Sequence, residues 1–237
     1  MRQVPHFLII GRGRLARHLT HYFSLLQFSY RVWHRGMSIQ LLQQHLHEST
    51  HVLLAIRDDA IDAFYQDHLQ HIHIIPVHFS GSTVNKVIYG AHPLMTFHDK
   101  LYDLARYQSI PFIVDDHAPD FSSLLPGLPN IHVRLSSEKK AKYHALCVLS
   151  GNFSCILWQK LFDTFSNEFN IPSSFAHPYL MQQIQNLLLH PQSALTGPLV
   201  RQDHSTIENN LKALEGDPFQ LIYKSFVDCY QQSIRED

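Results

Sequence analysis

The sequence has few charged residues, few cysteines and no long apolar run. Charged side chains make up only 16% of the 237 residues, with 19 Lys and Arg against 20 Asp and Glu. Apolar residues make up 45%, which is typical of a folded globular protein and excludes a disordered chain. The near-neutral charge balance, without a basic run, argues against a protein that binds nucleic acid by neutralising phosphates.

The short apolar segments and the sparse cysteines also bear on location. The apolar run at residues 7–10 is too short for a secretory signal. No continuous apolar run approaches the roughly 20 residues that a membrane span needs. Cys147, Cys155 and Cys229 form no short-spaced pair, and the first two lie eight residues apart in one apolar helical stretch, which is typical of buried thiols in a reducing compartment. We therefore expect a soluble, cytoplasmic protein without a membrane partner.

Histidine is unusually frequent, with 19 residues. His71, His73 and His78 surround an apolar segment, and such residues can bind metals. Because no cysteine or carboxylate accompanies them, the pattern favours a solvated strand edge, and we expect no metal site.

Strand and helix signals alternate through the first half of the chain. Between the apolar runs, large apolar residues repeat at helical spacing, as in Leu15, Leu19 and Tyr22. Such alternation predicts parallel strands joined by right-handed crossovers. We therefore expect an α/β fold, with a Rossmann-type domain at residues 1–135. The expected strands are 7–10, 30–34, 52–56, 72–79, 87–89, 111–114 and 131–135.

The pattern changes near Ser136, from which helical periodicity continues to the end of the chain. A capping box at residues 205–208 and the Asp217-Pro218 pair mark two helix starts. No Gly- or Ser-rich linker separates the two halves. The sequence therefore predicts an all-α C-terminal domain at residues 136–237.

The turn after the first expected strand reads Gly11-Arg12-Gly13-Arg14-Leu15-Ala16. In the pattern Gly-x-Gly-x-x-Ala, the first glycine permits a tight turn and the second lets the backbone approach a pyrophosphate. The small alanine allows helix and strand to pack closely, and the helix N-terminus attracts phosphate. This context predicts that these six residues bind a dinucleotide. A glycine turn that binds nothing is the alternative.

Cofactor choice depends on the end of the second expected strand, where NAD sites usually carry an acid. Residues 29–44 contain no acid, and Arg35 lies at the expected position. A guanidinium there can pair with a 2′-phosphate, with Arg12 assisting. The sequence therefore predicts NADP(H), although Arg35 is otherwise explained as an ordinary surface cation.

Several segments resemble a family of uncharacterised Rossmann-like proteins with a helical C-terminal domain of unknown function. That family is similar in fold to pyrroline-5-carboxylate reductase and 6-phosphogluconate dehydrogenase. The resemblance spans nearly the whole chain in the right order. It is carried by residues 11–16, 54–61, 78–81, 92–97, 143–152 and 195–203.

The resemblance implies a nicotinamide cofactor at the strand ends and a helical domain that closes the site and often dimerises. It implies no particular substrate. The sequence departs from the family at Gln202, where glycine is usual. In the related hydroxyacid dehydrogenases a catalytic lysine precedes the helix asparagine by four residues. Counting back from Asn152 gives Val148, so that lysine is missing.

His144 is the candidate proton donor. It precedes Asn152 by eight residues, just over two helical turns, so we expect both side chains on nearly one face. A histidine there could protonate a substrate while hydride arrives from the cofactor. A core histidine bonded to a neighbouring helix is the equally weighted alternative.

Four further residues are candidates for contacts in the cleft. Ser80 follows the fourth expected strand and could bond the nicotinamide amide or a substrate. His92, Thr196 and Arg201 could hold substrate, with Asp203 orienting Arg201. Structural turn chemistry and helix capping explain these loops equally well.

Three functions therefore compete. The first is an NADP-dependent oxidoreductase that reduces a small imine or carbonyl compound. The second is a protein that binds or senses the dinucleotide without turnover, and the third is a structural dimer module. The large apolar side chains of the helical half predict a symmetric homodimer.

Overall fold

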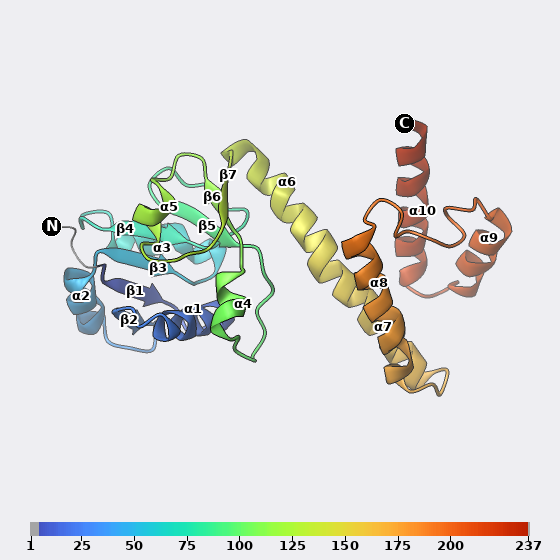
Figure 1. The fold of residues 1–237 in the computed structure, drawn as a ribbon, viewed down its shortest axis with the longest axis horizontal. Helices are drawn as coiled ribbons and strands as arrows, with labels where there is room; N and C mark the ends of the chain where they lie inside the picture. The colour runs from blue at the N-terminus through green and yellow to red at the C-terminus, as the bar shows by residue number, and fades with distance from the viewer. Residues whose placement is uncertain (1–4, 237) are drawn as a thin grey trace. The chain divides into compact units, whose positions relative to one another are not determined.

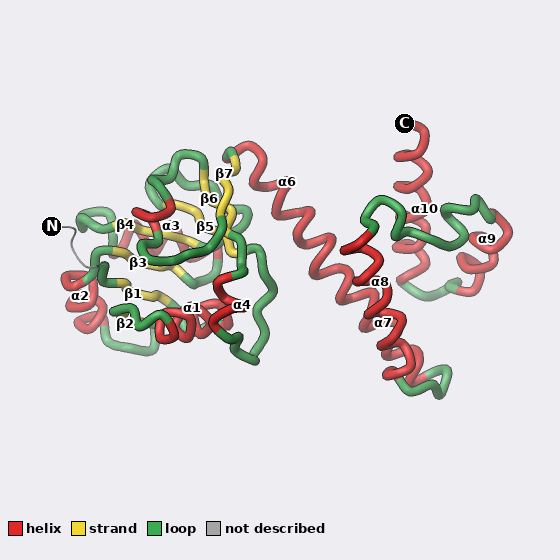
Figure 2. Tube along the Cα trace, viewed as in Figure 1, coloured by secondary structure: helices red, strands yellow, loops and turns green. Residues whose placement is uncertain are grey.

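The computed structural model describes residues 5–236 and confirms an α/β fold followed by helices. The chain divides into two compact units, Met1–Ile156 and Leu157–Asp237. All of the strands that the structure describes lie in the first unit, and the second consists of helices and loops (Figure 2). The expected division at residue 135 stays a prediction, because the sheet ends at Leu135 whereas the units meet at Ile156.

A seven-stranded sheet with the order β2-β1-β3-β4-β5-β6-β7 forms the centre of the first unit (Figure 1). All seven expected strands are present, most with bounds shifted by one to three residues. The bounds are β1 Phe7–Ile10, β2 Tyr30–Trp33, β3 His51–Leu54, β4 Ile75–His78, β5 Tyr89–Pro93, β6 Phe112–Asp115 and β7 His132–Leu135.

One pairing differs from the expected parallel sheet. β6 runs antiparallel to β5, with Ala91 opposite Val114 and Pro93 opposite Phe112. The connection between these strands carries only the short helix α4 (Leu104–Gln108), which packs beside α1 (Arg14–Leu25). A parallel return would need a helical crossover over the sheet. The chain instead reverses direction at this point.

Helices cover both faces of the sheet because the strands are apolar on both sides. Phe7 and Ile9 face one core, with α1, α4 and α5, whereas Leu8 and Ile10 face the other, with α2 and α3. Burial on both faces leaves only the strand ends for polar chemistry. The remaining helices of this layer are α2 Ile39–Glu48, η1 Asp58–Ala60, α3 Ile61–His68 and α5 Phe121–Leu124.

A continuous helix from Ser137 to Asn167 leaves the sheet after β7. It consists of α6 (Ser137–Cys147), a π-helical segment η2 (Val148–Phe153) and α7 (Ser154–Asn167). The second unit continues with η3 Ser173–Ala176, α8 His177–Leu189, α9 His204–Ala213 and α10 Phe219–Glu236.

The helix Ser137–Asn167 is long and apolar enough, by length and composition alone, to cross a membrane. Its most apolar 18-residue window has a mean hydropathy of 1.2, and none of that window is buried. The helices of soluble proteins also pass this test. No unbroken apolar run marks this segment in the sequence, because three lysines and His144 interrupt its beginning.

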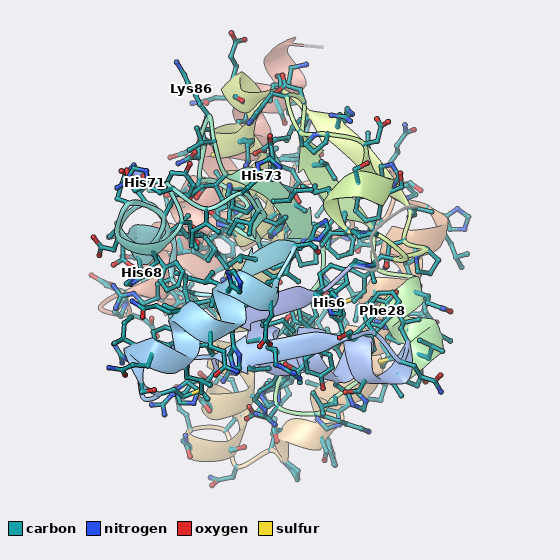
Figure 3. All side chains as sticks on the ribbon, turned by 90° about the vertical axis from the view of Figure 1, so that its left-hand side faces the viewer. His6, Phe28, His68, His71, His73 and Lys86 are labelled. Carbon is teal, nitrogen blue, oxygen red and sulfur yellow. The ribbon has the colours of Figure 1, made fainter. Side chains whose placement is uncertain are left out.

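The histidines near β4 lie in different surroundings. His71 and His73 lie exposed in the turn before the strand (Figure 3), whereas His78 at its end is fully buried. Within residues 5–236, no group of three or more potential ligands could hold a metal ion. The expectation of a solvated edge therefore fits the first two histidines and is wrong for His78.

Candidate functional site

The glycine turn joins β1 to α1 at the carboxyl edge of the sheet. Gly11 has φ +132°, and a Cβ there would lie 2.2 Å from the carbonyl oxygen of Ala55, so only glycine fits. A Cβ at Gly13 would have no other atom within 4 Å, so the space before the turn is open. Gly13 is also the N-cap of α1, without a side-chain cap. The first N–H groups of α1 are therefore available to an anion.

A groove of about 700 Å³ runs along this edge from the glycine turn. Four arginines line it, against one carboxylate, Asp67. The ends of β1, β2 and β3 meet here because the three strands are parallel. The arrangement is a cationic site of a size suited to a nucleotide. Its polar and turn lining includes Gly11, Arg12, Gly13, Arg14, Leu15, His34, Arg35, Arg57 and His68.

Arg35 lies in the turn after β2, exposed at one end of the groove. Within residues 5–236 it forms no ion pair, whereas Arg57 is paired with Asp59. The lining near β2 carries no acid that would bind a ribose 2′-hydroxyl. Arg12 lines the same groove. The geometry therefore leaves Arg35 and Arg12 free for an added phosphate.

Ser80 lies just beyond β4, but its hydroxyl is already engaged. Its Oγ donates to Asp58 Oδ2 at 2.5 Å and accepts the backbone N–H groups of Ser82 and Thr83 at 3.2 and 3.0 Å. A hydroxyl has one donor and two acceptor positions, so these bonds use all of them. Ser80 shapes the loop after β4, and its expected cofactor contact stays a prediction.

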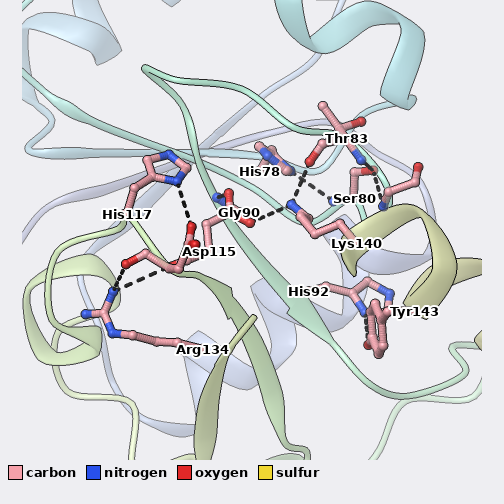
Figure 4. Close-up of polar contacts among 12 residues, drawn as sticks. His78, Ser80, Thr83, Gly90, His92, Asp115, His117, Arg134, Lys140 and Tyr143 are labelled. Carbon is pink, nitrogen blue, oxygen red and sulfur yellow. Dashed lines mark hydrogen bonds and ion pairs between the residues drawn. The ribbon is translucent and has the colours of Figure 1, made fainter. Parts of the chain in front are cut away.

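His92, Tyr143 and His144 come together beside this loop (Figure 4 shows the first two). Nδ1 of His92, on β5, is 2.7 Å from the Tyr143 hydroxyl on α6. The rings of His92 and His144 lie 5.8 Å apart at 89°. A Cβ built on Gly81 would lie 2.4 Å from Nδ1 of His144. His144 is therefore at the strand ends, and it does not point into the core of the helical half.

Burial governs the ionisation of this cluster. Burial, reinforced by His144 and Lys140, lowers the pKa of His92 to about 4, so its ring is neutral at pH 7. Burial also raises the pKa of Tyr143, which stays a phenol. A neutral His92 would bind a substrate as a hydrogen-bonding group, because it carries no positive charge.

A buried ion pair anchors the start of α6. Lys140 Nζ lies 2.6 Å from Asp115 Oδ1, with the two side chains 4% and 2% exposed, and it also donates to the carbonyl of Thr83 at 2.6 Å (Figure 4). Asp115 Oδ2 accepts the N–H of Gly90 at 2.7 Å. A Cβ at Gly90 would come within 2.8 Å of both charged groups. The pair thus joins α6 to β5, β6 and the loop after β4.

His78 lies beside this pair with one unsatisfied atom. Its Nδ1 accepts the N–H of Ser80 at 3.2 Å, whereas its buried Nε2 has no partner among the described residues. Burial, followed by the nearby Lys140 charge, lowers the pKa of His78 to about 4. The ring is therefore neutral at pH 7.

Sequence reasoning missed Lys140, Asp115, Tyr143 and Gly90 as parts of this site. One signal was present: Lys140 precedes Tyr143 and His144 by three and four residues, which places all three on neighbouring positions of one helix face. Asp115, the last residue of an apolar strand, gave a weaker signal. The meeting of two distant segments depends on the sheet order.

Asn152 lies in the π-helical segment and is exposed. In a regular α-helix, at about 100° per residue, eight residues leave an offset of about 80° between two side chains. A π-helical turn holds more residues, which reduces this offset. The role of Asn152 at the site stays a prediction.

Thr196 and Arg201 belong to the second unit, where both are exposed in the loop between α8 and α9. Gln202 has φ +52°, a conformation that favours glycine. The cap of α9 is Asp203 and not the expected Ser205, because Asp203 accepts the N–H of Thr206 at 3.1 Å. The helix-capping alternative therefore holds for Asp203. The substrate roles of Thr196 and Arg201 stay predictions.

Asp203 is further engaged by the hydroxyls of Thr206 and Ser205, at 2.7 and 3.0 Å. Its bonds to Thr206 keep the pKa of this carboxyl below its usual value. The charge of Arg201 also lowers this pKa, but it contributes less than the hydrogen bonds do.

Comparison with known proteins supports the same architecture. A candidate NADP oxidoreductase of Bacteroides fragilis is 20% identical, with a TM-score of 0.75 over 96% of this chain and 98% of that one. An imine reductase of Streptomyces aurantiacus is 10% identical, with a TM-score of 0.65 over 98% and 95%. No curated protein matches the sequence.

A third solved structure, a reductive aminase of Aspergillus terreus in complex with NADPH and ethyl levulinate, is 14% identical. Its TM-score is 0.60 over 99% of this chain and 95% of that one. At these identities the similarity shows the fold alone, which the chain shares with these oxidoreductases.

The family comparison covers the last strand of the sheet, β7, and most of the helical half. Residues 115–229 match a family described as a domain of unknown function, DUF2520. Together with the solved structures, this match confirms the resemblance seen in the sequence. The chain has a Rossmann-like fold, and its residues 115–229 match the DUF2520 family.

Proposed function

We propose that this protein is an NADP-dependent oxidoreductase that reduces a small imine or carbonyl compound. The observation that carries the proposal is the cationic groove at the uncapped N-terminus of α1. The groove follows the strand ends, and the polar groups of His92 and His144 lie farther along the same edge. A site of this kind needs a cofactor and a substrate-binding group close together.

The residues present fit a bound NADP(H). Gly11 to Ala16 would hold the pyrophosphate on backbone N–H groups, and Arg35 with Arg12 would hold the 2′-phosphate. When bound, the reduced cofactor supplies hydride. His92 and His144 would orient the substrate.

The alternative is a protein that binds or senses the dinucleotide without turnover. Val148 supports it, because it occupies the position where related hydroxyacid dehydrogenases carry a catalytic lysine. The clustered imidazoles favour the enzyme, because a binding protein needs no such groups beside the cofactor.

A fluorescence titration with NADPH and NADH tests cofactor binding. We expect tighter binding of NADPH, and Arg35→Glu should remove the preference by weakening NADPH binding about 10- to 100-fold, the value of one charge-assisted contact. Arg106→Glu, on α4 outside the groove, is the matched control and should have no effect. Equal affinities in the unmodified protein would contradict the NADP assignment.

Turnover is tested separately. Purified protein with NADPH and a panel of ketones, aldehydes and cyclic imines should show oxidation of the cofactor. Binding without oxidation of NADPH by any member of the panel would favour the sensor alternative.

We also propose a symmetric homodimer through the second unit, and a cytoplasmic location. Apolar side chains are widely exposed on α8 and α10, which suits an interface between copies. All three cysteines are free thiols, which fits a reducing compartment. The expectation of buried thiols is wrong for Cys155, which is exposed, and Cys147 is only half-buried.

A further inference from the structure

We propose that His92 and His144 act together as a pair of neutral N–H donors, each through Nε2, which binds the oxygen of a ketone or aldehyde substrate. This inference rests on the proposed function and narrows it from imines or carbonyl compounds to carbonyl compounds. It also changes the role of His144 from a proton donor to a hydrogen-bond donor. The donor role of each ring depends on which of its nitrogens is available to a ligand.

The Nδ1 atom of His92 is occupied by a hydrogen bond to Tyr143. Nδ1 lies 2.7 Å from the Tyr143 hydroxyl, whose other polar neighbour is the thiol of Cys147, a weak acceptor. If the phenol donates to Nδ1, one bond satisfies both groups; the reverse arrangement would leave the phenolic proton only the weakly accepting thiol of Cys147. The single proton of the neutral ring therefore resides on Nε2. The lowered pKa of His92 agrees with a neutral ring.

The Nδ1 atom of His144 is blocked by the backbone of Gly81. Nδ1 is buried against Gly81 and has no partner in the described part of the chain, whereas Nε2 is not buried. A buried N–H without an acceptor is rarer and costlier than a buried acceptor without a donor. The proton of this ring therefore also resides on Nε2. A doubly protonated ring would place an unpaired N–H against Gly81.

The two rings are close enough to serve one small ligand group. Their centroids are 5.8 Å apart and their planes are perpendicular, so two elements, β5 and α6, bring both rings within reach of one small ligand. Both elements belong to the first unit, and the Lys140–Asp115 pair connects them. The positions are therefore fixed before a ligand arrives, as preorganised donors require.

Neutral donors select for oxygen over a protonated imine. When a carbonyl carbon receives hydride, the electron pair of the C=O π bond moves onto oxygen, which then takes a proton from solvent water. Two N–H groups stabilise this developing negative charge. A protonated imine carries its positive charge on N–H groups, which are themselves donors, and develops no negative charge. The pair therefore favours ketones and aldehydes.

The tautomers are directly measurable. In protein labelled with ¹⁵N-histidine, NMR at pH 7 should show His92 and His144 with a proton on Nε2 and none on Nδ1. His92→Gln and His144→Gln assign the two signals by their loss. Acetate, a small oxygen anion, should shift both Nε2–H signals, whereas methylammonium should not. A proton on Nδ1 of either ring, or no response to acetate, would overturn the proposal.

Kinetics separate hydrogen bonding from proton donation. Glutamine keeps an N–H near the Nε2 position but cannot transfer a proton at neutral pH, whereas leucine offers neither. With NADPH and a ketone, His144→Gln should retain turnover within about 10-fold, and His144→Leu should lose about 100-fold or more. An equal loss in both variants would assign His144 to proton transfer and overturn the proposal.

His71→Gln, an exposed histidine far along the chain from either ring, is the control and should leave turnover unchanged. Faster reduction of cyclic imines than of ketones would also count against the donor pair. If the protein oxidises NADPH with none of the ketones, aldehydes or cyclic imines of the panel, the proposed function fails. The acetate titration alone then decides whether the donor pair exists.

Discussion

The imidazole of His144 lies directly on the backbone of Gly81. A Cβ at Gly81 would be 2.4 Å from Nδ1 of the ring, closer than non-bonded atoms can approach. The contact joins the loop after β4 to helix α6, so it sets where His144 can lie. Any side chain at residue 81 must displace that ring.

Gly81→Ala should therefore move His144 away from His92. Because Gly81 has no positive φ, the backbone itself is not strained by alanine. We expect a stability loss of about 1–3 kcal/mol from overpacking. Turnover should fall about 100-fold, since one preorganised donor is lost, with little change in NADPH affinity. Gly151→Ala, where a Cβ meets nothing within 4 Å, is the control. Unchanged turnover in Gly81→Ala would show that the position of His144 is unimportant.

Lys140→Met should strongly destabilise the first unit. The substitution leaves Asp115, 2% exposed, as a buried charge without its partner. Breaking one side of a buried pair typically costs about 3–5 kcal/mol. Urea denaturation measures the loss. The neighbouring Lys139→Met, at an exposed position, should change stability by less than about 0.5 kcal/mol.

A second variant separates charge from packing in the same place. Lys140→Met combined with Asp115→Asn removes the uncompensated charge, while the asparagine oxygen can still accept from Gly90. Most of the lost stability should return. If the double variant is no more stable than Lys140→Met, the unpaired carboxylate is not the cause.

Stability should fall between pH 6.5 and pH 4 because His78 is buried as a neutral ring. Its pKa is about 4 in the folded protein and about 6.5 when unfolded, so in this range the unfolded chain binds more protons. The stability from this group is complete above pH 6.5 and is lost as the pH falls toward 4. A shift of this size corresponds to about 3 kcal/mol, as an order of magnitude.

Urea denaturation at several pH values measures this dependence. His78→Asn keeps an acceptor near Nδ1 and cannot titrate, so its stability should depend less on pH. His71→Asn, at an exposed position, should retain the full dependence. The same slope in His78→Asn as in the unmodified protein would mean that other groups cause it.

Light scattering should give twice the 27.5 kDa mass of one chain, as expected of a homodimer. Leu188 on α8 is 78% exposed, and Leu189 and Tyr179 are also exposed on that helix. Leu188→Glu should therefore shift the protein toward monomer, because the interface would have to bury a charge. Gln185→Glu adds the same charge to the same helix at a polar position and should preserve the dimer. A monomeric mass for the unmodified protein at micromolar concentration would contradict the proposal.

The sequence alone determined the strands and the longer helices, because each depends on local physics, but it did not predict the short helices α4 and α5. Alternating apolar runs and helical periodicity identified all seven strands, and the turn at Gly11 to Ala16 follows from the glycine spacing and the helix that begins after it. It also placed His144 and His92 among the candidates, because each follows or lies within a recognisable segment. It could not show that β6 runs antiparallel to β5, because the direction of return depends on where the connection packs.

Only the tertiary structure brought distant residues together. Lys140 and Asp115 are 25 positions apart, and Gly81 lies 63 positions before His144, so no local pattern links them. The availability of each imidazole nitrogen was likewise undetermined by the sequence. Tyr143 occupies one ring nitrogen and the backbone of Gly81 blocks another, and both contacts arise from the packing of α6 beside β5 and the loop after β4. Residue type supplied the donors, and long-range packing decided which atoms face a ligand.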